Sequence, residues 1–230
     1  MNVQIEEVLN VVKKAVQLLP NPPRDSINKE IHIIQELIMH SRPPRIMIIG
    51  RRGAGKSSLI NAIFQEEVAA VGSVSSETPF GKWYSYKSES GSLDIMDTRG
   101  LGDRSRPKDS KFATPLEELT NELNEKYPDV IMFLSKAKEV DSRIDEDVNN
   151  LNEILTYIRN KHNYAPPVIG VITQVDELDP VYIDKPPYES EIKQKNIEDS
   201  VSRICEVFES NKIPLIKAIP VSAYAVFEEG

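Results

Sequence analysis

The sequence predicts an α/β fold, with a mostly parallel sheet that helices cover on both faces. Apolar runs of strand length alternate with segments whose apolar residues recur at helical spacing. The runs at 130–134 and 168–172 are apolar throughout, which is typical of parallel strands buried on both sides. A third apolar run, 45–49, leads into a glycine-rich loop and then into a helical pattern. Strand, glycine loop and helix in this order form a known α/β unit.

The glycine-rich loop is the most informative stretch of the chain. Residues 50–58 read Gly-Arg-Arg-Gly-Ala-Gly-Lys-Ser-Ser and match the phosphate-binding pattern G-x-x-x-x-G-K-[ST] at every fixed position. Gly50, Gly53 and Gly55 permit a tight turn that brings backbone N–H groups close to phosphate oxygens. The helix predicted over 58–65 directs its N-terminus at the same anion. On that helix Leu59, Ala62 and Ile63 are expected to share one face.

The two residues that close the pattern supply a charge and a metal ligand. We expect Lys56 to lie near the β- and γ-phosphates of a bound nucleotide, and the Ser57 hydroxyl to ligate Mg²⁺. By composition alone the pattern arises in about one chain per hundred of this size. The flanking strand and helix are the context that distinguishes a true phosphate-binding loop from a coincidence.

Composition and charge narrow the class of protein. The chain has 230 residues and a net charge of -8, which argues against a general nucleic-acid-binding surface. Its one cysteine, Cys205, cannot form an internal disulfide, so we expect a reducing, cytoplasmic setting. The sequence contains no apolar run of about 20 residues, which a membrane-spanning helix would need, and no signal peptide is evident.

Two helices are predicted ahead of the glycine-rich loop. Proline-rich segments end both, at 20–23 and at 43–44. We therefore divide the chain into a two-helix extension, 1–43, and a nucleotide-binding domain, 44–230, whose C-terminus could be truncated. The helices are expected to pack on the core or on each other. A surface for a membrane or a partner is the alternative, although the first helix offers only Lys13 and Lys14 to a lipid surface.

The rest of the chain continues the alternation of strands and helices. In chain order we predict a loop at 66–80, hairpin strands at 82–86 and 92–97, a loop at 99–112, helices at 116–127, 148–158 and 192–208, and a last strand at 216–221.

Further polar motifs follow successive predicted strands. Asp97 and Gly100 belong to an Asp-Thr-Arg-Gly segment, where the acid can hold Mg²⁺ through water and the glycine N–H can face the γ-phosphate. Asp176 ends a Thr-Gln-Val-Asp segment and can accept two hydrogen bonds from a guanine edge, whereas adenine would leave it unpaired. Ser222 and Ala223 follow the last strand, where a backbone N–H could reach the guanine oxygen.

Together these motifs resemble those of the translation-factor-related GTPases, in the branch that contains Era, TrmE and the septins. They are also similar to motifs of bacterial relatives of the immunity-related GTPases and of ribosome-binding GTPases. The resemblance covers about residues 44–225. It implies a P-loop NTPase fold of the GTPase type, with six strands, and GTP or GDP with Mg²⁺ as ligands.

The resemblance also implies roles for individual residues. Thr78, the only threonine between the loop and the next strand, would ligate Mg²⁺ and report the γ-phosphate. The implied metal ligands are Ser57, Thr78 and Asp97, and the implied catalytic residues are Lys56, Thr78 and Gly100. The implied nucleotide contacts are Gly50, Gly53, Ala54, Gly55, Lys56, Ser57, Ser58, Asp97 and Gly100 for the phosphates, and Thr173, Gln174, Asp176, Ser222 and Ala223 for the base.

The chain departs from the family pattern at several positions. Thr173 and Gln174 replace the usual asparagine and lysine of the base motif, which suggests weaker affinity. Leu101 stands where Ras-like enzymes have the glutamine that orients water, and Gly53 stands where potassium-dependent members have an asparagine. The family fold normally closes with a helix after the last strand. Either the chain is truncated at Gly230, or the N-terminal helices cover the site instead.

The sequence therefore predicts a GTP-binding protein that hydrolyses GTP slowly and acts as a switch or assembly module. A guanine-nucleotide-dependent interaction module without hydrolysis is the alternative, and Asp176 disfavours an ATPase. We expect a homodimer across the nucleotides. One of four arginines, acting in its own site or across the dimer, could supply the missing catalytic group: Arg51, Arg52, Arg99 or Arg104.

Overall fold

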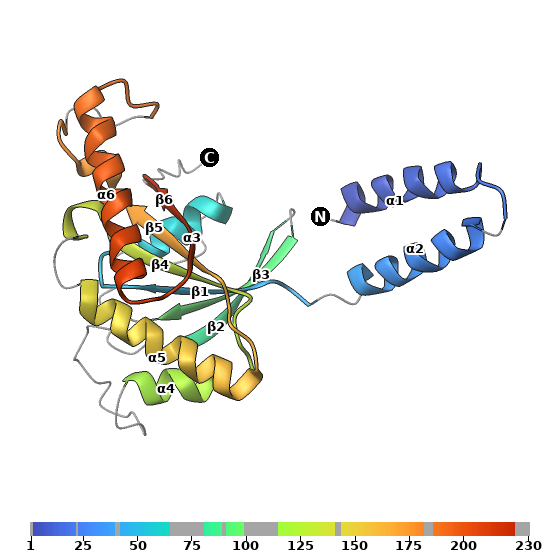
Figure 1. Cartoon of the computed structure of the whole chain (residues 1–230), viewed down its shortest axis with the longest axis horizontal. Helices are drawn as coiled ribbons and strands as arrows, with labels where there is room; N and C mark the ends of the chain where they lie inside the picture. The colour runs from blue at the N-terminus through green and yellow to red at the C-terminus, as the bar shows by residue number, and fades with distance from the viewer. Residues whose placement is uncertain are drawn as a thin grey trace. The chain divides into compact units, whose positions relative to one another are not determined.

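A computed structural model describes residues 2–21, 23–39, 42–64, 81–88, 91–98, 115–140, 144–181 and 186–223. The structure contains a six-stranded sheet with the strand order β2-β3-β1-β4-β5-β6, flanked by helices (Figure 1). The pairings of β1 with β3 and β4, of β4 with β5, and of β5 with β6 are all parallel. This confirms the predicted α/β fold with a mostly parallel sheet.

The strands and helices follow the predicted order, with shifts of up to five residues at their ends. The predicted loops at 66–80 and 99–112 lie outside the described residues. The strands are β1 (Arg45–Gly50), β2 (Gly81–Ser88), β3 (Gly91–Thr98), β4 (Val130–Lys136), β5 (Val168–Thr173) and β6 (Leu215–Pro220). The helices are α1 (Asn2–Val16), α2 (Pro23–Met39), α3 (Lys56–Phe64), α4 (Pro115–Glu122), α5 (Ile144–His162) and α6 (Glu191–Ser210), with short 3₁₀ turns η1 (Ala137–Glu139) and η2 (Val175–Glu177).

Two apolar clusters, one on each face, hold the sheet. Successive side chains of a strand point to opposite faces, so Met47 and Ile49 of β1 join one cluster while Ile48 joins the other. The first cluster also contains buried side chains of α4, α5 and α6, and the second contains Ile60 of α3. All of these β1 side chains are fully buried, which explains why the strand is apolar without alternation.

The buried face of α3 differs from the prediction. Ile60 is fully buried against Ile48 and Ile95, and Ile63 is 45% exposed. Leu59 packs partly against the same cluster, as expected. The helix has only nine residues, so the direction in which it leaves the glycine-rich loop sets its face more than its apolar spacing does.

The chain divides into two compact units, residues Met1–Pro43 with Lys87–Ser92, and Pro44–Tyr86 with Leu93–Gly230. Within the first unit α1 contacts α2, and Val16 and Ile31 are buried. Other apolar side chains of these helices stay in contact with solvent, among them Val8 at 62% and Val11 at 68% exposure.

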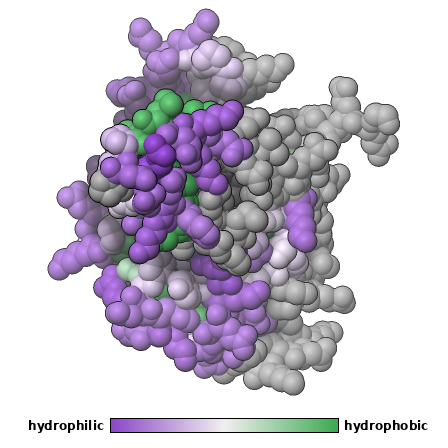
Figure 2. All heavy atoms as spheres, turned by 90° about the vertical axis from the view of Figure 1, so that its right-hand side faces the viewer, coloured by the Kyte–Doolittle hydropathy of each residue, from purple (hydrophilic) through white to green (hydrophobic). Residues whose placement is uncertain are grey.

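The described surface seen in Figure 2 is largely hydrophilic, with apolar side chains visible between the polar ones. Among the described residues, no helix combines the length and the apolar character needed to cross a membrane.

Candidate functional site

The predicted site residues that the structure describes gather at the carboxyl ends of neighbouring strands. The register places Gly50 opposite Leu134 and Lys136 opposite Thr173, so the ends of β1, β4 and β5 lie at the same edge of the sheet. Ligands of open α/β sheets bind at this edge. The glycine-rich loop, which joins β1 to α3, therefore lies where a ligand site is expected.

The conformation of the loop requires its glycines. Gly53 and Gly55 adopt φ values of +79° and +80°, in the left-handed region that side chains disfavour. Gly50 is needed for space, because an added Cβ would lie 2.8 Å from the carbonyl oxygen of Leu134. Ala54 N donates to the carbonyl oxygen of Arg51 at 3.1 Å and closes the turn. The loop thus has the backbone shape that the phosphate-binding pattern predicts.

Lys56 begins α3 and folds back across the loop. Its Nζ donates to the carbonyl oxygens of Gly50 and Arg51, each at 3.1 Å. The ammonium is thereby held over the loop that precedes it. Ser57 and Ser58 lie in the first turn of α3, directly after Lys56, and are half-buried.

Two residues of the predicted base motif are bonded to the loop. Thr173 is buried, and its Oγ1 donates to the carbonyl oxygen of Ala54 at 2.9 Å. Gln174 adopts φ 58°, and its Nε2 donates to the carbonyl oxygen of Gly53 at 3.3 Å. The structure therefore joins the two predicted halves of a nucleotide site into one unit. It also gives Thr173 and Gln174 a contact with the loop that the sequence did not indicate.

Asp176 and the segment after β6 lie next to the same edge. Asp176 belongs to η2 and is half-buried. Val221 N donates to the carbonyl oxygen of Ile172 at 2.8 Å, and Val175 N lies 3.5 Å from the carbonyl oxygen of Val221. Ser222 and Ala223 follow directly and are half-buried. Main-chain hydrogen bonds thus join the end of β6 to the end of β5, close to Asp176.

The other predicted site residues are described only in part. Asp97 pairs in register with Ile48 near the end of β3, and its side chain lies outside the described residues. Its neighbour Thr98 is buried and donates from Oγ1 to the carbonyl oxygen of Ile48 at 2.7 Å. Thr78, Arg99, Gly100, Leu101 and Arg104 also lie outside the described residues.

Lys136 is a site residue that sequence reasoning missed. It ends β4, and its Nζ lies 3.4 Å from the point where a Cβ on Gly53 would be. Glu139 Oε1 binds the same Nζ at 3.1 Å. A second lysine therefore lies beside the loop, from a strand other than the one that carries the base motif. A search for charged residues at the ends of apolar runs would have found it.

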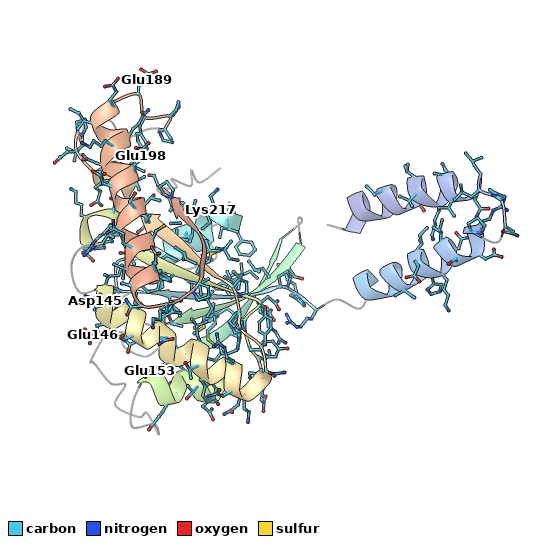
Figure 3. The ribbon with its side chains drawn as sticks, viewed as in Figure 1. Asp145, Glu146, Glu153, Glu189, Glu198 and Lys217 are labelled. Carbon is cyan, nitrogen blue, oxygen red and sulfur yellow. The ribbon has the colours of Figure 1, made fainter. Side chains whose placement is uncertain are left out.

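Arg51, inside the loop, is bonded to the first turn of α5. Its Nε lies 2.5 Å from Asp147 Oδ2, and its Nη2 lies 3.9 Å from Glu146 Oε2. Figure 3 shows Asp145 and Glu146 on this acidic turn. Arg51, Lys136, Glu139 and Asp147 line one small pocket next to the loop.

The pKa values of Arg51 and Asp147 both lie above their ordinary values, for different reasons. The hydrogen bond that Arg51 donates to Asp147 raises the pKa of Arg51, which stays charged. Burial raises the pKa of Asp147 above 3.8, although the bond from Arg51 acts in the opposite direction. Asp147 Oδ1 is buried and has no hydrogen-bond partner in the described structure, which agrees with a carboxylate that burial destabilises.

Comparison with known proteins identifies the family. Residues 45–174 match the family model described as 50S ribosome-binding GTPase. The chain belongs to this GTPase family. Its fold is shared with solved structures of Era.

Individual relatives share about 30% sequence identity with the chain. The chain is 28% identical over 174 residues to YfjP of Escherichia coli K12, a match that covers 76% of this chain and 54% of YfjP. It is 31% identical over 138 residues to the GTPase Der of Streptococcus suis, covering 58% of this chain and 27% of Der. The chain therefore spans about half the length of YfjP and a smaller part of Der.

Solved structures share the fold at low identity. A dimerization-deficient mutant of Toc33 from Arabidopsis thaliana is 18% identical, with a TM-score of 0.52, covering 91% of this chain and 82% of Toc33. Era from Aquifex aeolicus, bound to GDP·AlF₄⁻, is 23% identical with a TM-score of 0.50, covering 80% of this chain and 52% of Era.

Proposed function

We propose that this GTPase-family chain binds GTP with Mg²⁺ and hydrolyses it slowly to GDP and phosphate, as a nucleotide-dependent switch or assembly module of the cytoplasm. The observation that carries the proposal is the pair of bonds from Thr173 to Ala54 and from Gln174 to Gly53. They join the segment that would read the base to the loop that would hold the phosphates. Residues 44–230 would form this domain, with 1–43 as a helical extension.

The residues of the loop would bind the phosphates. Backbone N–H groups of 53–58 would face the phosphate oxygens, because the left-handed Gly53 and Gly55 shape the turn for this. Lys56 would exchange its two carbonyl bonds for phosphate oxygens. Ser57 is the first metal ligand that we assign, with Thr78 and Asp97 as the others. Bound Mg²⁺ would neutralise charge on the β- and γ-phosphates.

Recognition of guanine would fall to Asp176 and to the segment after β6. The Asp176 carboxylate can accept from the ring N–H and the amino group of guanine. The backbone N–H groups of Ser222 and Ala223 would donate to the guanine oxygen. Thr173 and Gln174 would act through the phosphate loop to which they bond.

The alternative is a guanine-nucleotide-dependent interaction module that does not hydrolyse GTP. Leu101, in place of a water-orienting glutamine, favours it. Release of phosphate from GTP over several turnovers distinguishes the two. We expect slow, Mg²⁺-dependent release that Lys56→Ala abolishes. Tight GTP binding without release by the unmodified protein would support the alternative, and equal binding of ATP and GTP would contradict the guanine assignment.

A further inference from the structure

Lys193 is a lysine that the described structure buries completely. It lies in the first turn of α6, and its side chain has 0% exposure. Lysine is rarely buried to this extent without partners, because its ammonium loses the hydration that stabilises the charge. The position of Lys193 therefore calls for an explanation beyond packing.

Main-chain carbonyl oxygens surround the ammonium. Nζ donates to the carbonyl oxygens of Asp176 at 2.6 Å, Leu178 at 2.9 Å and Pro180 at 3.3 Å. An ammonium has three donors, so all three are used on a single turn. The ring of Tyr188, with its centroid 5.0 Å from Nζ, adds a cation–π contact.

The turn that Lys193 holds carries the proposed base-reading carboxylate. Asp176 is the middle residue of η2, which begins directly after Gln174 in its left-handed conformation. Buried or half-buried carbonyl groups outside regular strands and helices need donors from elsewhere. Asn196, further along α6, supplies another, from Nδ2 to the carbonyl oxygen of Asp179 at 2.9 Å. This end of α6, which lies between the labelled Glu189 and Glu198 in Figure 3, thus donates to four carbonyl groups between residues 176 and 180.

We propose that Lys193, assisted by Asn196, is a positioning residue that fixes the main chain of Asp176 for guanine recognition. This inference rests on the proposed function, in which Asp176 reads the base. The hydrogen bond from Lys193 to the main-chain carbonyl of Asp176 fixes the position of the backbone from which the Asp176 carboxylate extends. A small displacement would lengthen both carboxylate bonds to guanine, and misplacement of this kind costs affinity steeply.

Inosine diphosphate (IDP) is the comparison ligand. Its base, hypoxanthine, lacks the amino group of guanine and can therefore form only one of the two hydrogen bonds to Asp176. The test measures Kd for GDP and for IDP by competition against a fluorescent GDP, and compares the ratio of the two. Lys193→Met removes the three donors and keeps a similar apolar stem. The matched control is Lys195→Met, which changes an exposed lysine on the same helix. Thermal unfolding of each variant confirms that it folds.

We expect Lys193→Met to weaken GDP binding about tenfold and IDP binding less, so that the IDP-to-GDP ratio of Kd values falls at least about threefold. Lys195→Met should leave both constants unchanged. A purely structural role would weaken GDP and IDP equally, so an unchanged ratio in folded Lys193→Met overturns the proposal. If Lys193→Met does not fold, Asn196→Ala decides: a smaller ratio supports the proposal and an unchanged ratio overturns it.

Asp176→Ala separates this inference from the proposed function. If Asp176→Ala leaves the ratio of the unmodified protein intact, then Asp176 does not read the base, and the assignment itself fails. If Asp176→Ala removes the discrimination while Lys193→Met preserves it, the assignment stands and only the positioning role is overturned.

Discussion

Lys136 places a cation beside Gly53, although the base motif has Gln174 where related GTPases have a lysine. We predict that Lys136→Met lowers the affinity for GTP and GDP by about 1 kcal/mol, roughly fivefold, because a charge near the phosphates is lost. Titration with a fluorescent nucleotide measures this. Lys138→Met, which changes an exposed lysine two residues away, is the control. Equal affinity of Lys136→Met and the unmodified protein would show that Glu139 already neutralises this lysine.

Asp147 should make the stability of the protein depend on pH in a defined direction. Burial raises its pKa above the ordinary value of 3.8, even though Arg51 opposes the shift and Glu146 and Glu139 add to it. Between these two pKa values the folded state binds more protons than the unfolded state. The contribution of Asp147 to the free energy of unfolding is therefore most favourable below pH 3.8 and falls as pH rises through the raised pKa.

Urea denaturation at stepped pH tests this sign. The free energy of unfolding of the unmodified protein minus that of Asp147→Asn should decrease as pH rises from about 3 to 7. Asp145→Asn, on the exposed side of the same turn, should show no such trend (Figure 3). A difference that grows with pH would mean that the ion pair with Arg51 outweighs the burial of Asp147.

At the scale of elements, β5 and the phosphate loop are joined by the buried Thr173 hydroxyl. We predict that Thr173→Val, nearly isosteric, lowers the free energy of unfolding by about 1–3 kcal/mol, because the Ala54 carbonyl loses its donor. Nucleotide affinity should fall as well, since the loop loses an anchor. Denaturation and nucleotide titration measure the two effects. Thr156→Val, on the exposed face of α5, is the control for replacing a threonine by valine at a position away from the loop. Loss of stability without loss of affinity would refute a link between this bond and the loop's function.

Most of the elements could be predicted from the sequence, because continuous apolar runs identify the central strands and the glycine loop fixes the first crossover. Which face of α3 is buried could not be predicted. Apolar spacing alone does not distinguish Ile60 from Ile63, and only packing against Ile48 does. Lys136 and Lys193 were missed for a related reason. Their roles depend on strand register and on a turn that lies 13 to 17 residues from Lys193 in sequence. The local pattern marks Lys136 as a charge at the end of an apolar run, but it does not place that charge beside Gly53. It carries no information on the contacts of Lys193.

At the scale of the whole molecule, the open question is how a chain with Leu101 in place of glutamine would position water and neutralise charge in the transition state. The four arginines proposed for this are no longer equivalent. Arg51 is bonded to α5, whereas Arg52 is exposed within the loop. Arg99 and Arg104 lie outside the described residues. Among the described candidates, Arg52 is therefore the better placed to reach a second copy of the chain.

We predict a dimer that forms with a GTP analogue and Mg²⁺, is weaker with GDP, and raises turnover per molecule as protein concentration increases. Arg52→Ala should remove this rise, because a guanidinium supplied by the partner would be lost. Arg159→Ala, on the exposed end of α5, should leave it intact. Light scattering gives the mass in each nucleotide state, and phosphate release over a concentration series gives the activity. A monomer in every state with constant specific activity would exclude the dimer, and the missing group would then have to come from a separate activating protein.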